Sequence, residues 1–155
     1  MNIFQSKSST LVKVVTIGVV MALAFVSLSL VVIDKKYGLI GSLILGAIII
    51  GALVYFYANS LDKIIVEKDG VVLKKNIGQI YIPKSDIVKV DKLAYSNLTM
   101  TYGSKGVFGF IGNTMDDTVS FVKDRNHMVR ITTTSKKYIL SSERIDELLS
   151  AIRGL

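Results

Sequence analysis

The chain has 155 residues, of which 50% are hydrophobic, and its formal net charge is +7. An ordinary soluble domain of this size is less apolar, so the excess must be concentrated in one segment of the chain. The absence of cysteine and the presence of a single histidine leave few residues for a metal site or for cysteine-based catalysis.

The apolar excess lies in the first 58 residues. Two runs, 14–33 and 39–58, contain no charged residue over 20 positions each. A bilayer core about 30 Å thick is crossed by a helix of about 20 apolar residues. The sequence therefore predicts two transmembrane helices joined by a short external loop, 34–38, as an antiparallel hairpin.

A cleaved signal peptide is an alternative interpretation of the first run, because Lys7 and Lys13 precede it. Its length argues against that, since the apolar region of a signal peptide spans about 7 to 15 residues. Lysines flank the outer ends of the hairpin more densely than its loop, and cytoplasmic flanks carry such an excess. We expect residues 1–13 and the region from residue 59 onward in the cytoplasm, in a multi-pass protein of the cytoplasmic membrane.

Small residues recur four apart in the second run and would let another helix backbone approach closely. The expected partner is the first helix of the same hairpin, with self-association into an oligomer as the open alternative. The candidate packing residues are Ser42, Gly46, Ala47 and Gly51.

Residues 59–155 change character and predict a mainly-β domain of about seven strands. Runs of β-branched residues alternate with turn residues, as at Asp69-Gly70, a dipeptide that suits a tight hairpin. Pro83 interrupts one run because proline lacks the ladder donor. This region carries fifteen lysines and arginines against eleven acids.

The chain ends in a predicted helix. Ile145, Leu148, Leu149 and Ile152 follow the helical spacing i, i+3, i+4, i+7 and would form one apolar face. Ser141-Ser142 is the expected N-cap. Such a face needs a partner, which a strongly bent antiparallel sheet would supply.

Three segments carry a resemblance to a known family. These are "IPKSDI" at 82–87, "GSKGVFGFIG" at 103–112 and the serine-preceded final helix. Together they resemble the bacterial pleckstrin-homology-like (PH-like) domains found behind membrane hairpins, over roughly residues 61–152. The resemblance implies a partly closed, seven-stranded β-barrel plugged by the C-terminal helix, and it implies no activity. An OB-like barrel is the alternative, against which the terminal helix argues.

The segment 103–112, here called the glycine-aromatic turn, allows two interpretations. In the first, its glycines permit bulges or positive φ in a strand-to-strand connection while Phe108 and Phe110 pack inward. In the second, an exposed apolar tip contacts lipid or a protein partner. The candidate contact residues are Lys105, Phe108, Phe110 and Ile111. A nucleotide-binding loop is disfavoured, because no glycine-lysine pair precedes a helix here.

Other functional classes find little support in the residues. The hairpin that binds phosphoinositides in eukaryotic relatives here carries lysines without arginine, so non-specific attraction to anionic lipid is favoured over specific binding. His127, Asp124, Ser141 and Ser142 lack any recognisable nucleophile signature. We expect no enzyme, no cofactor, no metal and no nucleic-acid partner.

The sequence thus favours a membrane-anchored binding or scaffolding module with a protein partner. The alternative function is a structural subunit of a larger membrane complex, assembled through the hairpin itself.

Overall fold

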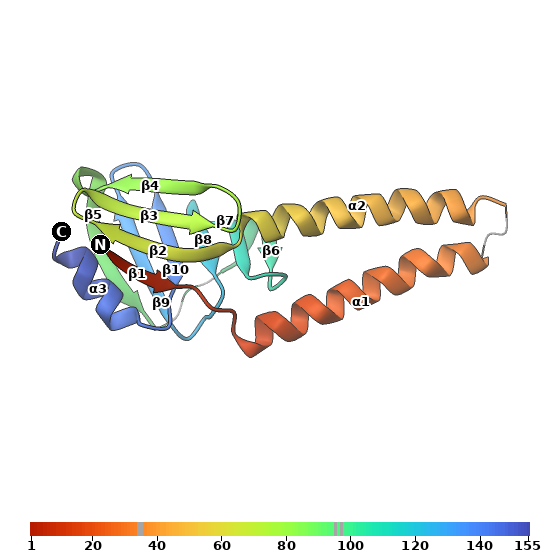
Figure 1. Cartoon of the computed structure of the whole chain (residues 1–155), viewed down its shortest axis with the longest axis horizontal. Helices are drawn as coiled ribbons and strands as arrows, with labels where there is room; N and C mark the ends of the chain where they lie inside the picture. The colour runs from red at the N-terminus through yellow and green to blue at the C-terminus, as the bar shows by residue number, and fades with distance from the viewer. Residues whose placement is uncertain (34–35, 95, 97) are drawn as a thin grey trace.

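A pair of long helices projects from one end of a mainly-β region in the computed structural model, which describes residues 1–33, 36–94, 96 and 98–155 (Figure 1). Helix α1 spans Thr10–Ile33 and helix α2 spans Gly38–Asn59. Both are long and apolar enough to cross a membrane. Of the predicted external loop, residues 34 and 35 lie outside the described part of the chain.

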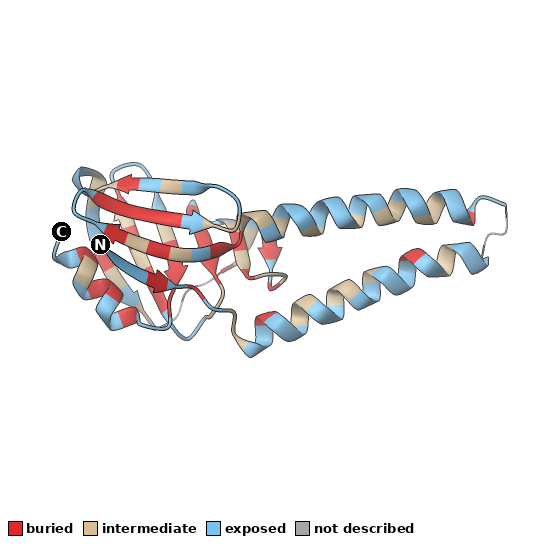
Figure 2. Cartoon of the chain, in the orientation of Figure 1, coloured by how far each residue is buried: buried red, intermediate tan, exposed pale blue. Residues whose placement is uncertain are grey.

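Small polar groups join the two helices. Ser27 of α1 is buried, and its hydroxyl donates to the carbonyl oxygen of Ser42 in α2 at 3.1 Å. The remaining surface of both helices is apolar and largely exposed (Figure 2). The hairpin therefore packs along one narrow seam and leaves its other faces uncovered by the chain.

In the described part of the chain, the β region contains ten strands in two sheets, followed by one helix. The first sheet has the order β1-β2-β3-β4, and the second has the order β5-β9-β10-β8-β7-β6. The strands are β1 Asn2–Gln5, β2 Leu61–Glu67, β3 Gly70–Lys75, β4 Gln79–Pro83, β5 Ile87–Leu93, β6 Met100–Lys105, β7 Phe110–Thr114, β8 Thr118–Val122, β9 Met128–Thr133 and β10 Lys137–Ser141, and the helix is α3 Ile145–Arg153.

The expected strand number was too low. The glycine-rich segment Phe110–Thr114 forms β7 rather than a plain connection, and Asn2–Gln5 forms β1 ahead of the helices. Gly112 of β7 pairs with Gly103 of β6, and the absence of a side chain on both residues lets the two backbones approach closely.

The expectation of a β-barrel is wrong, because the two sheets do not close on each other. At one side, Pro83 ends β4 and a short 3₁₀ turn, Lys84–Asp86, sends the chain into the other sheet. At the other side, the free edge of β1 meets side chains instead of a strand: Ser142 donates to the carbonyl oxygen of Gln5 and Arg144 to that of Ile3. The architecture is therefore mainly β with a C-terminal helix, and the sheet remains open.

The helical hairpin is inserted in the connection between β1 and β2, two neighbouring strands of the first sheet. It pairs antiparallel with β2, with Phe4 opposite Ile64, so the chain leaves the sheet at Gln5 and returns at Leu61. Phe4 is only 3% exposed and belongs to the main core. The two helices thus stand where an ordinary β-hairpin would have a short turn.

Helix α3 buries the apolar face predicted for it. Ile145, Leu148, Leu149 and Ile152 are all buried in the main core, against residues of both sheets. The expected serine N-cap is wrong: Arg144 occupies the N-cap position without a side-chain cap, and Ser141 ends β10. Both serines are instead used in contacts with the segment that precedes α1.

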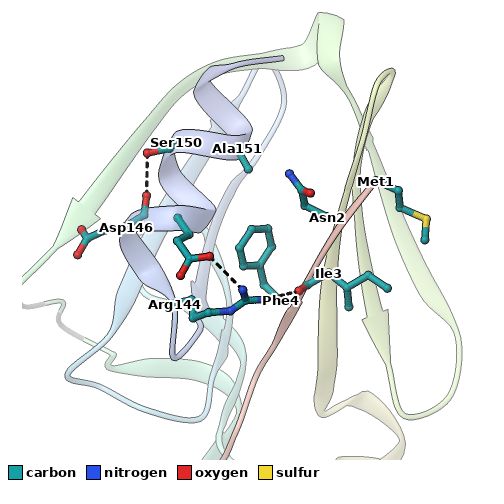
Figure 3. Close-up of a pocket in the computed structure, with 9 residues that line it drawn as sticks. Met1, Asn2, Ile3, Phe4, Arg144, Asp146, Ser150 and Ala151 are labelled. Carbon is teal, nitrogen blue, oxygen red and sulfur yellow. Dashed lines mark hydrogen bonds and ion pairs between the residues drawn. The ribbon is translucent and has the colours of Figure 1, made fainter.

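An open groove of about 650 Å³ runs between β1 and α3 (Figure 3). Arg144 crosses it, donating to the carbonyl oxygen of Ile3 at 2.8 Å and to the Glu147 carboxylate at 3.0 Å. Its guanidinium also lies 5.1 Å from the centre of the Phe4 ring. These contacts make the groove a seam between strand and helix, bridged by one arginine.

Candidate functional site at the helix bases

The glycine-aromatic turn reaches between the two helices at the point where they leave the β region (Figure 1). It is closed by a hydrogen bond from the Gly106 N–H to the Gly109 carbonyl oxygen, at 2.9 Å. A β-carbon on Gly106 would lie only 3.0 Å from a methyl carbon of Val15 in α1. The backbone of the turn therefore touches the first helix directly.

Phe108 joins both helices to the β region. Its N–H donates to the hydroxyl of Thr16 in α1 at 2.9 Å, and that hydroxyl donates to the Val12 carbonyl at 2.7 Å. Its carbonyl oxygen accepts from the hydroxyl of Ser60, directly after α2, at 3.0 Å. Its ring meets the ring of Tyr57 edge to face, with centroids 5.6 Å apart. Phe108 thus contacts both arms of the hairpin at the end that adjoins the β region.

The turn can reach this position because of its unusual backbone. Phe108 has a φ of +58°, in the left-handed region that non-glycine residues seldom adopt. Gly103 and Gly112 pair across the strands with φ values of +133° and +136°. A β-carbon on Gly112 would lie 2.1 Å from the Tyr102 carbonyl oxygen, so no side chain fits there.

The predicted contact residues do not form one exposed cluster. Lys105 is exposed at the end of β6, whereas Ile111 is only 4% exposed and belongs to the main core. Phe108 is half-buried between the helices, and Phe110 packs on a second small core beneath Arg125, whose guanidinium lies 5.3 Å from the ring centre. Residues 103–105 and 110–112 thus belong to strands β6 and β7, and only residues 106–109 connect them, with Phe108 and Phe110 packed against other residues.

The four candidate helix-packing residues divide into two pairs. Ser42 and Gly46 face α1, since Ser42 contacts Ser27 and a β-carbon on Gly46 would lie 3.7 Å from the Ser27 hydroxyl oxygen. Ala47 is exposed, and a β-carbon on Gly51 would meet nothing within 4 Å. Only Ser42 and Gly46 pack within the hairpin, and Ala47 and Gly51 lie on its outer surface.

Sequence reasoning missed Thr16, Tyr57 and Ser60 as partners of the turn. Thr16 is the first polar residue of the apolar run 14–33, and a hydroxyl in apolar surroundings needs a hydrogen-bond partner. The Val12 carbonyl oxygen in the same helix already supplies such a partner, so this signal was weak. It could not identify Phe108, which lies more than ninety positions later in the chain.

Basic residues gather around this junction. Lys123 follows β8, and its carbonyl oxygen accepts from the N–H of Ser9 just before α1. Burial lowers the pKa of the Lys123 ammonium, an effect that the nearby Asp62 carboxylate opposes. The Lys75 ammonium donates to the Asn59 side chain, at the last residue of α2, at 2.9 Å.

Asp124, His127 and Ser141, which were considered for catalysis, form hydrogen bonds that stabilise the turn between β8 and β9. The Asp124 carboxylate accepts from the N–H of Asn126 at 3.0 Å and contacts the His127 ring nitrogen Nδ1 at 2.6 Å. The buried Ser141 hydroxyl accepts from the N–H groups of Lys123 and Asp124. Within the described residues, no group of three or more His, Cys, Asp or Glu is placed to hold a metal ion.

A family model described as "Bacterial PH domain" matches residues 62–155 of this sequence. The chain belongs to the bacterial PH domain family. No curated protein and no solved structure matches the sequence. The matched PH domain contains the glycine-aromatic turn and α3, and it excludes β1 and both helices. In this chain, the family fold is therefore joined to a helical hairpin and an additional edge strand.

Proposed function

We propose that the chain is a two-span membrane protein that presents its bacterial PH domain at the cytoplasmic face as a binding or scaffolding module. The uncovered apolar surface of the helices carries this proposal. In the most apolar stretch of each helix, 6% of the residues of α1 and none of α2 are buried by the rest of the chain. A bilayer covers such surface, whereas water would leave an unusually large apolar patch exposed.

The way in which the domain is attached to the two helices supports a scaffolding role. The chain enters the hairpin from β1 and leaves it into β2, and Phe108 contacts residues at both helix ends. A domain tethered by one flexible linker would sample many orientations, but this one is held at three points. A fixed orientation presents the same face to a protein partner at all times, which lowers the entropic cost of binding.

The proposal includes no catalysis and no cofactor. The only histidine is bonded within the β8–β9 turn, and the buried Ser141 hydroxyl accepts from two backbone N–H groups. Neither is arranged as an activated nucleophile with its base.

Cysteine labelling tests insertion and sidedness, because the natural sequence has no cysteine. A Lys36→Cys variant places the thiol between the spans, and a Lys136→Cys variant places it in the exposed β9–β10 turn. In intact spheroplasts, a membrane-impermeant maleimide should label only the first, and both should be labelled after lysis. The reverse pattern would invert the topology, and release of the protein from membranes by alkaline carbonate would refute insertion.

The alternative function, assembly through the hairpin, is favoured by the outer position of Ala47 and Gly51. Gly51→Leu should leave the monomer intact, since nothing lies within 4 Å of its β-carbon position, and should break a complex that uses this face. Deletion of residues 60–155 should release a partner that binds the PH domain and spare a complex built by the helices. The size of the complex in mild detergent distinguishes the two.

Gly46→Leu is the matched change on the inner face. It should destabilise the hairpin itself by about 1 to 3 kcal/mol, because the side chain must fit against Ser27. We expect a lower thermal midpoint in detergent for Gly46→Leu and an unchanged one for Gly51→Leu. Equal midpoints for the two variants would contradict the packing of Ser42 and Gly46 against α1.

A further inference from the structure

The basic residues of the protein are concentrated at one end of the β region. Eight of the nineteen lysines and arginines lie in the segments around the helix bases, against three acids, one of which is the Glu143 partner of Lys7. The rest of the β region is nearly balanced, with nine basic residues and eight acids. We call this group the cationic collar: Lys7, Lys13, Lys63, Lys74, Lys75, Lys105, Lys123 and Arg125.

The segments that carry the collar all adjoin the hairpin. Lys13 is in the first turn of α1, and Lys105 precedes Gly106, which contacts that helix. Arg125 lines a cavity of about 600 Å³ together with Thr10 and Leu11, the first residues of α1. Asp124 also lines this cavity, with its carboxylate bonded to Asn126 and His127. The collar therefore surrounds the ends of the two apolar helices.

Three of the collar residues are placed unfavourably for the folded protein by itself. Lys13 places a positive charge at the N-terminal end of a helix, where the helix dipole favours a negative one, and the first turn of α1 has no acid. Lys63 and Lys74 lie directly opposite each other on β2 and β3, and like charges in such a pair repel. Both costs are reduced when an anion from outside the chain approaches the collar.

The location of the collar identifies the anion. A lysine one position before a 20-residue apolar run lies at the depth of the lipid headgroups when that run crosses the bilayer. Long basic side chains at this level extend toward the headgroups and bury their stems along apolar surface. Phosphate groups of the surrounding lipid are therefore the nearest supply of negative charge.

We propose that the cationic collar binds the headgroups of anionic phospholipids in the same membrane that holds the hairpin. This inference rests on the proposed membrane insertion, and it adds a ligand class and a binding surface. The surface lies at the opposite end of the first sheet from the β2–β3 turn at Lys68-Asp69, and it belongs partly to helix α1, outside the matched PH domain. Bound headgroups would brace the β region against the bilayer.

The test uses the full-length protein in vesicles of phosphatidylcholine with spin-labelled lipid as the probe. The fraction of motionally restricted label gives the affinity of the protein for phosphatidylglycerol relative to phosphatidylcholine. Each basic residue that reaches an anionic surface contributes up to about fivefold in affinity, and exposed charges deliver less because salt screens them. For the wild-type protein we expect a preference for phosphatidylglycerol of about threefold or more.

A triple variant and a matched control isolate the collar. Lys13→Gln, Lys105→Gln, Arg125→Gln removes three exposed charges beside the helices, and the preference should fall close to one. Lys68→Gln, Lys136→Gln, Lys137→Gln removes three exposed charges at the far end of the strands and should keep the wild-type preference. Equal loss in both variants would show a net-charge effect, and would overturn the proposal.

A salt titration of the wild-type protein gives an answer that depends on no variant. Raising the salt from about 0.05 M to about 0.5 M should bring the preference toward that of the triple variant, because the screening length shortens several-fold. A preference that persists at high salt, or one that is absent at low salt, would overturn the proposal. So would a triple variant that keeps its lipid preference but loses a co-purifying protein, since the collar would then bind protein.

The two proposals fail in different ways. If alkaline carbonate strips the protein from the vesicles, membrane insertion is refuted and the collar proposal falls with it. If the protein stays in the bilayer and shows no preference among lipids, only the collar proposal is refuted.

Discussion

Replacing Phe108 with alanine is expected to release the β region from the helices. The substitution removes the phenyl ring, which contacts the ring of Tyr57 and packs against the main core. The ring is half-buried, so we expect the free energy of unfolding to fall by about 2 to 3 kcal/mol, below the range for a fully buried phenylalanine. The hydrogen bonds of the Phe108 backbone to Thr16 and Ser60 remain chemically available, but the turn loses the packing that positions them.

The orientation of the hairpin is the informative measurement. Spin labels on cysteines introduced at Ala47 in α2 and Lys68 in the β2–β3 turn report the distance between the two parts by pulsed electron resonance. We expect one narrow distance distribution in the otherwise wild-type protein and a broad one with Phe108→Ala.

Phe110→Ala provides the matched control. Phe110 is also half-buried, and it packs on the second core beneath Arg125. Its loss should lower stability to a similar degree and leave the distance distribution narrow. A broad distribution in both variants would assign the effect to general loosening of the domain.

Replacing Gly112 with alanine should be more damaging to stability than its small size suggests. The residue has a φ of +136°, and its β-carbon would lie 2.1 Å from the Tyr102 carbonyl oxygen and 2.8 Å from the Gly103 α-carbon. Relief requires the β6 and β7 backbones to separate at their paired glycines. Backbone strain alone costs about 1 to 3 kcal/mol, and with the steric clash we expect a total of about 3 kcal/mol or more.

Chemical denaturation of the full-length protein in detergent measures this loss, and Gly78→Ala is the comparison. Gly78 also has a positive φ, of +83°, but the nearest atom to its β-carbon position is the end of the Lys75 side chain at 3.8 Å. Its substitution should cost about 1 kcal/mol from backbone strain. Equal losses for the two glycines would contradict the close approach of β6 and β7.

The features predicted correctly from sequence are those that depend on neighbouring residues. The two charge-free runs predicted helices, because a long apolar run has few other structures available to it. The face formed by Ile145, Leu148, Leu149 and Ile152 was confirmed, since helical spacing alone brings these side chains together. The family was also confirmed, from short segments that keep their turn and strand signals.

The features that were missed depend on contacts between distant parts of the chain. Four residues, Asn2–Gln5, are too short to show a strand pattern, and they form β1 only because β2 offers a partner some sixty positions later. The open sheet could not be foreseen either. Side chains from Ser142 and Arg144 occupy the edge of β1 where a strand would have closed the barrel.

The glycine-aromatic turn has one property that local sequence predicts and another that it does not. Its glycines correctly indicated an unusual backbone, because positive φ is a local property. The surroundings of Phe108 are not local, since they combine Thr16 of α1 with Tyr57 near the end of α2 and Ser60 directly after it. Residue type alone therefore predicted apolar contact at this position and left the partner open.

The insertion of the helices between β1 and β2 has a practical consequence for obtaining the PH domain in soluble form. A fragment that begins after α2 lacks β1, and it exposes the edge of β2 and leaves Arg144 and Ser142 without their carbonyl partners. The two strand ends that flank the helices are adjacent, because the N–H of Ser6 donates to the Asp62 carbonyl at 3.0 Å. A linker of about two to five residues is enough to connect antiparallel neighbours. Substituting such a linker for the two apolar helices would keep β1 in register, and it would give the β region without its helical hairpin and with its edge strand in place.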